Sequence, residues 1–221
     1  MNLIRHLEFF DPLDLKTPVH IIGLGAVGSH IAIFLTRLGI SNFTLWDFDT
    51  VGDHNIPNQH FEEKHIGQRK VDAISKQMLE INPDIKITKK DKYNPETIIN
   101  GHVFMCVDDI ELRHQFYLTH EFEIALMSVF DTRIALEVGQ LFSAKWNNNE
   151  HKELLISNSA FTNSEVEEEV SACGSKLAVL PTIVMIANIA VINFMNLIKT
   201  NELKPFMTFN TFNLTFSKPH K

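Results

Sequence analysis

The sequence predicts an α/β fold of the Rossmann type: a mostly parallel sheet with helices on both faces and antiparallel edge strands. Three observations predict it. Strand-like apolar runs alternate with amphipathic helical segments from Pro18 to Thr119, a glycine-rich turn joins the first strand to the first helix, and no helix separates the later strand-like runs at residues 123–130 and 133–146. Alternating strands and helices favour parallel strands joined by helical crossovers.

The first four elements follow from local patterns. Residues 18–25, PVHIIGLG, form a short apolar run that ends in glycines, which is typical of a buried strand. Residues 26–39 carry apolar side chains at helical spacing, and Gly39 is a plausible stop. Residues 42–48 predict a second strand, and residues 67–83 predict an amphipathic helix that ends at Asn82-Pro83.

The next elements complete the sheet. Alternation over residues 85–93 indicates an exposed or edge strand, and residues 102–109 indicate a buried one, with a helix from Ile110 to about Thr119 after it. Further strands are expected over residues 123–130, 133–146 and 204–217. Because no helix separates the first two of these strands, we expect antiparallel pairing at that edge.

Two segments have more than one interpretation. Residues 177–198 are long and apolar enough to span a membrane, but the segment contains Pro181 and three asparagines, and no comparable second segment exists. A buried helix, with a subunit interface as one role, is the better interpretation. Residues 147–172 are polar and acidic and predict a mobile crossover loop or lid within a single domain of residues 1–221, although a solvated face would also explain the glutamates.

Composition excludes several classes of protein. The chain has 221 residues, 44% of them apolar, so it can bury a sizeable core, and its net charge of −7 argues against a protein that coats nucleic acid. Two cysteines make a disulfide scaffold improbable and cannot supply a four-cysteine zinc site. The N-terminus does not resemble a signal peptide, so we expect a cytoplasmic protein that does not enter a membrane.

The glycine-rich turn predicts a nucleotide site. Gly23, Gly25 and Gly28 have G-x-G-x-x-G spacing between a strand and a helix, where backbone N–H groups at the helix N-terminus can bind phosphate. This motif alone suits NAD, FAD, SAM-like ligands or ATP, and a tight structural turn is the alternative. Asp47 ends the second strand, where a carboxylate would bind ribose hydroxyls; a capping or turn-forming role is the alternative.

The stretch WDFDTVGDHNIPNQ, residues 46–59, contains more short polar side chains than a plain dinucleotide site would explain. Taken with GLGAVGS, LTRLGI, G-x-x-K, INP, CVDDIELR and the later G-Q strand pair, it resembles the ThiF/MoeB/HesA family, relatives of ubiquitin-activating enzymes. The similarity extends over roughly residues 18–216, and its motifs are jointly specific although each alone is weak.

The resemblance implies an ATP-dependent adenylyltransferase that uses Mg²⁺. It would activate the C-terminal glycine carboxylate of a small ubiquitin-like or sulfur-carrier protein ending in Gly-Gly and release pyrophosphate, as a homodimer. The roles implied by the motifs are nucleotide binding by Gly23, Gly25, Gly28, Asp47, Asn55, Gln59 and Lys70, with Asp108 as the magnesium ligand and Lys70 at the phosphates. Without the motif, Lys70 would be an exposed helix lysine and Asp108 a helix cap.

Three departures from the family pattern stand out. Asn58 occupies the position of the arginine in the usual N-x-x-R-Q motif; neighbouring Arg69 or a partner subunit would have to replace that cation. The paired CxxC motifs are absent, so no zinc is expected. The N-terminal extension is short, and Arg5 lies too close to the glycine loop to match the arginine that family dimers contribute across their interface.

The two cysteines have different predicted roles. Cys173 lies where relatives carry a cysteine that accepts the activated carrier, which makes it a catalytic candidate by resemblance; a small packing residue or a nonreactive thiol is the alternative. Cys106 lies in an apolar run and is predicted to belong to the core. His54, His60 and His65 are expected to be solvated or capping rather than metal ligands.

Two alternative functions remain at this point. A non-catalytic nucleotide- or partner-binding module of the same fold would explain Asn58. An NAD- or FAD-dependent oxidoreductase would explain the glycine loop and Asp47, but not the polar stretch that follows.

Overall fold

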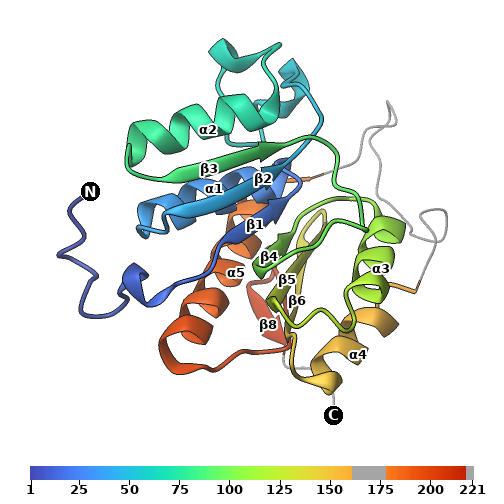
Figure 1. Ribbon diagram of the computed structural model, residues 1–221. Coiled ribbons are helices and arrows are strands. Elements are labelled where there is room, and N and C mark those ends of the chain that lie inside the picture. The colour runs from blue at the N-terminus through green and yellow to red at the C-terminus, as the bar shows by residue number, and fades with distance from the viewer. Residues whose placement is uncertain (161–177, 218–221) are drawn as a thin grey trace.

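An eight-stranded sheet forms the centre of the protein. The computed structural model describes residues 1–160 and 178–217. The sheet has the order β3-β2-β1-β4-β5-β6-β7-β8 (Figure 1). Its strands are β1 (Val19–Ile22), β2 (Asn42–Trp46), β3 (Lys86–Lys90), β4 (Gly101–Met105), β5 (Leu126–Ala135), β6 (Val138–Lys145), β7 (Phe206–Asn210) and β8 (Thr215–Ser217). Pairing is parallel from β3 to β5 and antiparallel from β5 to β8, which confirms the predicted fold class.

Helices cover both faces of this sheet (Figure 1). The described part contains α1 (Ala26–Arg37), α2 (Lys70–Ile81), α3 (Ile110–Thr119), α4 (Asn149–Ser157) and α5 (Leu180–Thr200), with short 3-10 helices at Pro12–Asp14, Asp53–Asn55 and Glu63–His65. Helices α1, α2 and α5 pack on one face, and α3 and α4 pack together on the other. The predicted helices at 26–39, 67–83, 110–119 and in the apolar segment are thereby confirmed.

Two hydrophobic cores lie on opposite faces of the sheet because side chains alternate along each strand. On β1, Ile21 belongs to the core beneath α1 and α5, whereas Ile22 belongs to the core beneath α3 and α4. In the first core, the rings of Phe104, Phe130 and Phe194 lie 5.0 to 5.7 Å apart and attach α5 to β4 and β5. Their burial holds the parallel strands in place beneath the helices.

Helix α5 is long and apolar enough to cross a membrane, judged by length and composition. In its most apolar window, 44% of the residues are buried within the protein. It packs against α1, β5 and β6, and Ile183, Ile186 and Phe194 are fully buried. These contacts support the interpretation as a core helix.

The strand predictions were wrong at two turns. Residues 123–130 and 133–146 were expected as separate strands, but β5 runs through Asp131 and Thr132 to Ala135, and the chain turns at Leu136 with φ 38°. Residues 204–217 were expected as one strand, but a turn divides them into β7 and β8. The side chain of Asn210 accepts the N–H of Phe212 at 2.9 Å and stabilises that turn.

The prediction of a mobile loop over residues 147–172 was wrong for its first part. Helix α4 begins after Asn148, whose side chain accepts the N–H of His151 at 3.2 Å as an N-cap. Leu155 is fully buried and fastens α4 to the second core. A capping side chain and an apolar anchor thus contribute to the order of this polar segment, while residues 161–172 lie outside the described part.

Candidate active site

The predicted site residues follow neighbouring strands at the carboxyl edge of the sheet. Strand β1 lies between β2 and β4, so the chain leaves it in one direction for β2 and β3 and in the other for β4. The glycine loop follows β1, Asp47 follows β2, and Asp108 lies shortly after β4. Open parallel sheets bind ligands at such a reversal of strand order.

The glycine loop makes contacts that side chains would prevent. Gly23 has φ +90°, and a Cβ atom there would lie 2.8 Å from the carbonyl oxygen of Cys106. A Cβ on Gly28 would lie 1.9 Å from the carbonyl oxygen of Gly23. At Gly25, in contrast, no atom lies within 4 Å of a built Cβ, and no side chain caps α1. The loop therefore packs tightly against β4 and leaves the N-terminus of α1 open toward an anion.

Asp47 joins the end of β2 to this loop. Its carboxylate accepts the N–H of Leu24 at 2.7 Å and the N–H of Asp49 at 2.8 Å. The residue is 8% exposed; burial raises the pKa of Asp47, and the nearby Lys70 ammonium and the two N–H donors act in the opposite direction. Each carboxylate oxygen has a further lone pair, so Asp47 can still accept a hydroxyl while it holds the loop.

Lys70 is buried rather than exposed. Its side chain lies at the start of α2, only 6% of the residue is exposed, and Nζ lies 2.8 Å from Oδ2 of Asp49. Its backbone N–H also donates to the carbonyl of Asp49 at 2.9 Å. The alternative of a solvated helix lysine was therefore wrong, and Lys70 lies beside both aspartates that end β2.

The polar loop between β2 and α2 packs against α1. The N–H of His60 donates to Ser29 Oγ at 2.9 Å, and Asn55 accepts the N–H of Gly52 at 2.9 Å, so Asn55 stabilises the loop itself. The buried Oε1 of Gln59 has no hydrogen-bond partner within the described residues. A buried acceptor of this kind suits a donor on a bound ligand. Arg69 points elsewhere, into an exposed ion pair with Asp91.

Asp108 and Asp109 are neighbours, but only Asp109 caps helix α3, and Asp108 remains the candidate magnesium ligand. Asp109 is the N-cap of α3 and accepts the N–H of Leu112 at 3.0 Å, so the capping role considered for Asp108 belongs to its neighbour. Asp108 is exposed at the carboxyl edge. No group of three or more His, Cys, Asp or Glu side chains suited to a metal exists among the described residues. Magnesium commonly binds through one or two carboxylates and substrate phosphates, so a single aspartate fits this mode.

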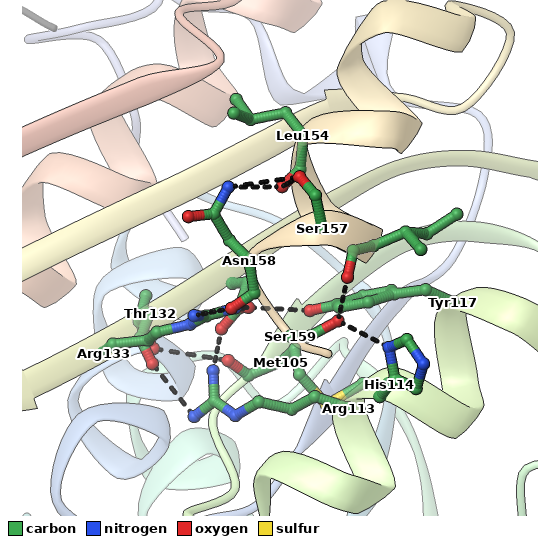
Figure 2. Close-up of polar contacts among 12 residues, drawn as sticks. Met105, Arg113, His114, Tyr117, Thr132, Arg133, Leu154, Ser157, Asn158 and Ser159 are labelled. Carbon is green, nitrogen blue, oxygen red and sulfur yellow. Dashed lines mark hydrogen bonds and ion pairs between the residues drawn. The ribbon is translucent and has the colours of Figure 1, made fainter. Parts of the chain in front are cut away.

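A buried charge cluster includes Arg113, Tyr117 and Arg133 (Figure 2). Arg113 of α3 forms an ion pair with Asp131 of β5, and the two residues are 5% and 0% exposed. Asp131 also accepts hydrogen bonds from Tyr117 Oη at 2.8 Å and Arg133 Nη2 at 2.6 Å. Burial lowers the pKa of Arg113 to about 10, so the guanidinium stays charged at neutral pH.

Of the two cysteines, only Cys106 lies in the part of the chain that the structure describes. Cys106 packs against the first core directly beneath the glycine loop, as its predicted core role implies, and burial raises the pKa of its thiol to about 11. A neutral thiol of this kind is a poor nucleophile. Cys173 lies outside the described residues. The sequence analysis missed Asp49 as the partner of Lys70 and missed the buried cluster of Arg113, Asp131 and Arg133; only the DFDT repeat of aspartates signalled the first of these.

Comparison with known proteins gives a consistent family match. A family model described as "ThiF family" matches residues 14–221. Ubiquitin-like modifier-activating enzyme 5 of Drosophila persimilis is 37% identical over 105 residues, which is 48% of this chain and 26% of that protein. Molybdopterin-synthase adenylyltransferase of Salmonella typhimurium is 34% identical over 121 residues, which is 51% of this chain and 49% of that protein.

A solved structure described as E. coli MccB with ATP has the same fold. It superposes with a TM-score of 0.71 at 15% identity, over 93% of this chain and 64% of that one. The chain spans about a quarter to a half of the length of the curated relatives it matches. Family and fold are therefore shared, while the activity of the whole protein has to be inferred.

Proposed function

This chain belongs to the ThiF family, and from that premise we propose that it is an ATP-dependent adenylyltransferase. Its substrate would be the C-terminal glycine carboxylate of a small ubiquitin-like or sulfur-carrier protein. One observation carries the proposal: in a chain of this family, the glycine loop, Asp47, Lys70 and Asp108 follow the strands β1, β2 and β4 that meet at the reversal of strand order.

The reaction needs alignment and charge compensation. A carboxylate oxygen of the carrier attacks the α-phosphorus of ATP, the bond from that phosphorus to the bridging oxygen breaks, and pyrophosphate leaves with the electron pair. Both reactants are anions, so the site must bring like charges together. Magnesium, when bound, would neutralise phosphate charge and orient the leaving group.

The residues of this chain have distinct proposed tasks. The open N–H groups at Gly25 and the start of α1 would bind phosphate oxygens, and Asp47 would accept ribose hydroxyls. Lys70 would contact the phosphates as a point charge, Gln59 would line the site, and Asp108 would hold magnesium. We also propose a cytoplasmic homodimer; Ile192, 54% exposed on α5, supplies apolar surface for a subunit contact.

A second candidate is a nucleotide-binding module without turnover. Asn58 lies where the family pattern has an arginine, Arg69 is paired with Asp91, and Lys70 is paired with Asp49. Fewer cations are therefore directed at phosphate than the family pattern supplies. The nicotinamide or flavin alternative loses its support, since the family match accounts for the glycine loop and the polar loop together.

The proposal is tested by ligand binding and then by turnover. ATP with Mg²⁺ should raise the melting temperature of the wild type, and NAD should not, because a ligand that binds only the folded state stabilises it. Asp47→Ala should lose the ATP shift, whereas Asp53→Ala, a control in the same segment with a side chain 92% exposed, should keep it. ATP–pyrophosphate exchange with purified ubiquitin-fold proteins ending in Gly-Gly then separates the two candidates. Binding without exchange favours the module, and no ATP binding refutes both.

A further inference from the structure

The charge cluster contains more positive than negative charge. Asp131 has no exposed surface, and the side chains of its two partners, Arg113 and Arg133, are 6% and 20% exposed. Two guanidiniums thus share one buried carboxylate. Burying such a group is costly unless each donor finds an acceptor, so the remaining hydrogen bonds of the two arginines show which backbone segments the cluster holds.

Arg113 holds the loop that carries Asp108. Its Nη2 donates to the carbonyl oxygen of Val107, the residue directly before Asp108, and also to the carbonyl of Thr132 on β5 at 3.1 Å. Asp109 holds the other end of the same loop as the cap of α3. The β4–α3 loop is therefore fastened on both sides of Asp108, and one of these attachments depends on a buried guanidinium.

Asp131 sets the direction of that guanidinium through their ion pair. One carboxylate oxygen pairs with Arg113, and the other accepts Tyr117 Oη at 2.8 Å and Arg133 Nη2 at 2.6 Å. A planar guanidinium can bind the carboxylate and two carbonyls at once, which a lysine ammonium at the end of a flexible chain cannot match in geometry.

Arg133 extends the same cluster to the end of α4. Its Nη1 donates to the carbonyl oxygen of Asn158 at 2.6 Å, and its guanidinium lies 4.5 Å from the ring centre of Phe142. Beside it, Ser159 Oγ lies 3.1 Å from Nδ1 of His114, a residue of α3 (Figure 2). One buried carboxylate thereby links β5, α3 and the end of α4.

We propose that Arg113, oriented by Asp131, is a positioning residue that fixes the Val107–Asp109 segment so that Asp108 meets magnesium bound to the nucleotide. This inference rests on the proposed function for the role of Asp108. It assigns no contact between Arg113 and the substrate. Its direct consequence is a rigid β4–α3 loop before any ligand arrives, and this consequence can be measured without turnover.

The test uses Arg113→Lys in the full chain, with Asn193→Ala as a control. Asn193 is also buried and hydrogen-bonded, through Ser143 and Lys204, but lies on α5. Without ligand, amide hydrogen exchange of residues 105–112 should accelerate at least about tenfold in Arg113→Lys and stay unchanged in the control. The Mg²⁺ concentration that gives half of the ATP-induced thermal shift should rise about tenfold, a usual cost of losing an outer partner of a metal ligand.

Tyr117→Phe covers the case in which Arg113→Lys does not fold. It removes only the hydroxyl that orients Asp131 and should change both readouts less, in the same direction. Unchanged exchange and an unchanged Mg²⁺ requirement in the variants that fold would overturn the inference. If the wild type does not respond to ATP with Mg²⁺, the proposed function has failed instead, and the exchange of residues 105–112 still decides whether Arg113 fixes the loop.

Discussion

Two pairs of aspartate and cation flank the carboxyl edge of the sheet, and they differ in burial. In the pair Lys70–Asp49, the lysine side chain is 7% exposed but the aspartate side chain is 49% exposed. In the pair Arg113–Asp131, the side chains are 6% and 0% exposed. The first pair is open to solvent on one side, so a ligand could draw Lys70 away from Asp49; the second is enclosed by protein.

This difference in burial indicates that the first pair contributes to ligand binding and the second to the stability of the fold. A half-exposed ion pair contributes little to stability, and its cation remains available to a phosphate at modest cost. Replacing both partners of a fully buried pair by apolar residues changes the stability of the protein little. Removing only one partner lowers stability strongly, because it leaves a buried charge without its counter-charge. We therefore expect substitutions in the first pair to act mainly on ligand binding, and substitutions in the second to act on stability and, through the β4–α3 loop, on the Mg²⁺ requirement.

The largest effect is expected for Asp131→Ala, which leaves two guanidiniums without their carboxylate. It should lower the free energy of unfolding by about 3–5 kcal/mol, measured by urea denaturation. Asp49→Ala is the matched variant in the half-open pair and should lower it by less, because the carboxylate of Asp47 still lies near the Lys70 ammonium. Equal losses in the two variants would remove the distinction between the pairs.

A smaller effect is expected for Lys70→Met, this time on binding. Loss of the cation should weaken ATP·Mg binding about ten- to hundredfold, or 1.4–2.8 kcal/mol, as measured by calorimetry. Lys76→Met, on the exposed face of the same helix, should bind like the wild type.

Asp49→Asn sharpens this result because it frees Lys70 from its partner. It should bind ATP at least as tightly as the wild type if Lys70 turns to the phosphates. Weaker binding in Asp49→Asn than in Lys70→Met would indicate that Asp49, not Lys70, contacts the ligand.

The two pairs were not equally predictable from the sequence. The glycine loop and Asp47 are local signals, since the spacing of glycines and the end of a strand are visible in one stretch of chain. The role of Lys70 could be predicted only from the family resemblance, because its partner Asp49 precedes it by 21 positions. Without the motif, Lys70 would have been predicted as an exposed lysine on a helix.

Asp131 was misread for a related reason. Asp131 and Thr132 interrupt an apolar run, so local pattern predicts a turn there, yet β5 continues through both. A charged residue is tolerated within the strand because Arg113 of α3 neutralises its charge and Tyr117 of α3 donates a hydrogen bond to it. Arg133 is close to Asp131 in sequence, but Arg113 and Tyr117 are brought to it only by the tertiary fold, which is why the fold was more predictable than its buried polar contacts.

The smallest effect concerns pH, to which the two sides of the edge should respond differently. Arg113, with a pKa of about 10, keeps its charge from pH 5 to 8. His30 of α1, whose ring lies 5.2 Å from that of His60 in the polar loop, has its pKa lowered from 6.5 to about 4, mainly by burial and also by His60. Above pH 6.5, His30 is neutral in both the folded and the unfolded state. Between pH 6.5 and 4, His30 is protonated in the unfolded state but stays neutral in the folded state, so the folded state loses stability as the pH falls.

Acid should therefore destabilise the polar-loop side through His30. His30→Gln should reduce the loss of unfolding free energy between pH 7 and pH 5 by about 1–2 kcal/mol, measured as urea curves at the two pH values. His54→Gln is the control, since the side chain of His54 is 79% exposed, and it should reproduce the wild-type loss. If His30→Gln loses as much stability on acidification as the wild type, His30 does not exclude a proton in the folded state. The next variant to measure would then be His102→Gln, since burial likewise lowers the pKa of His102 to about 4.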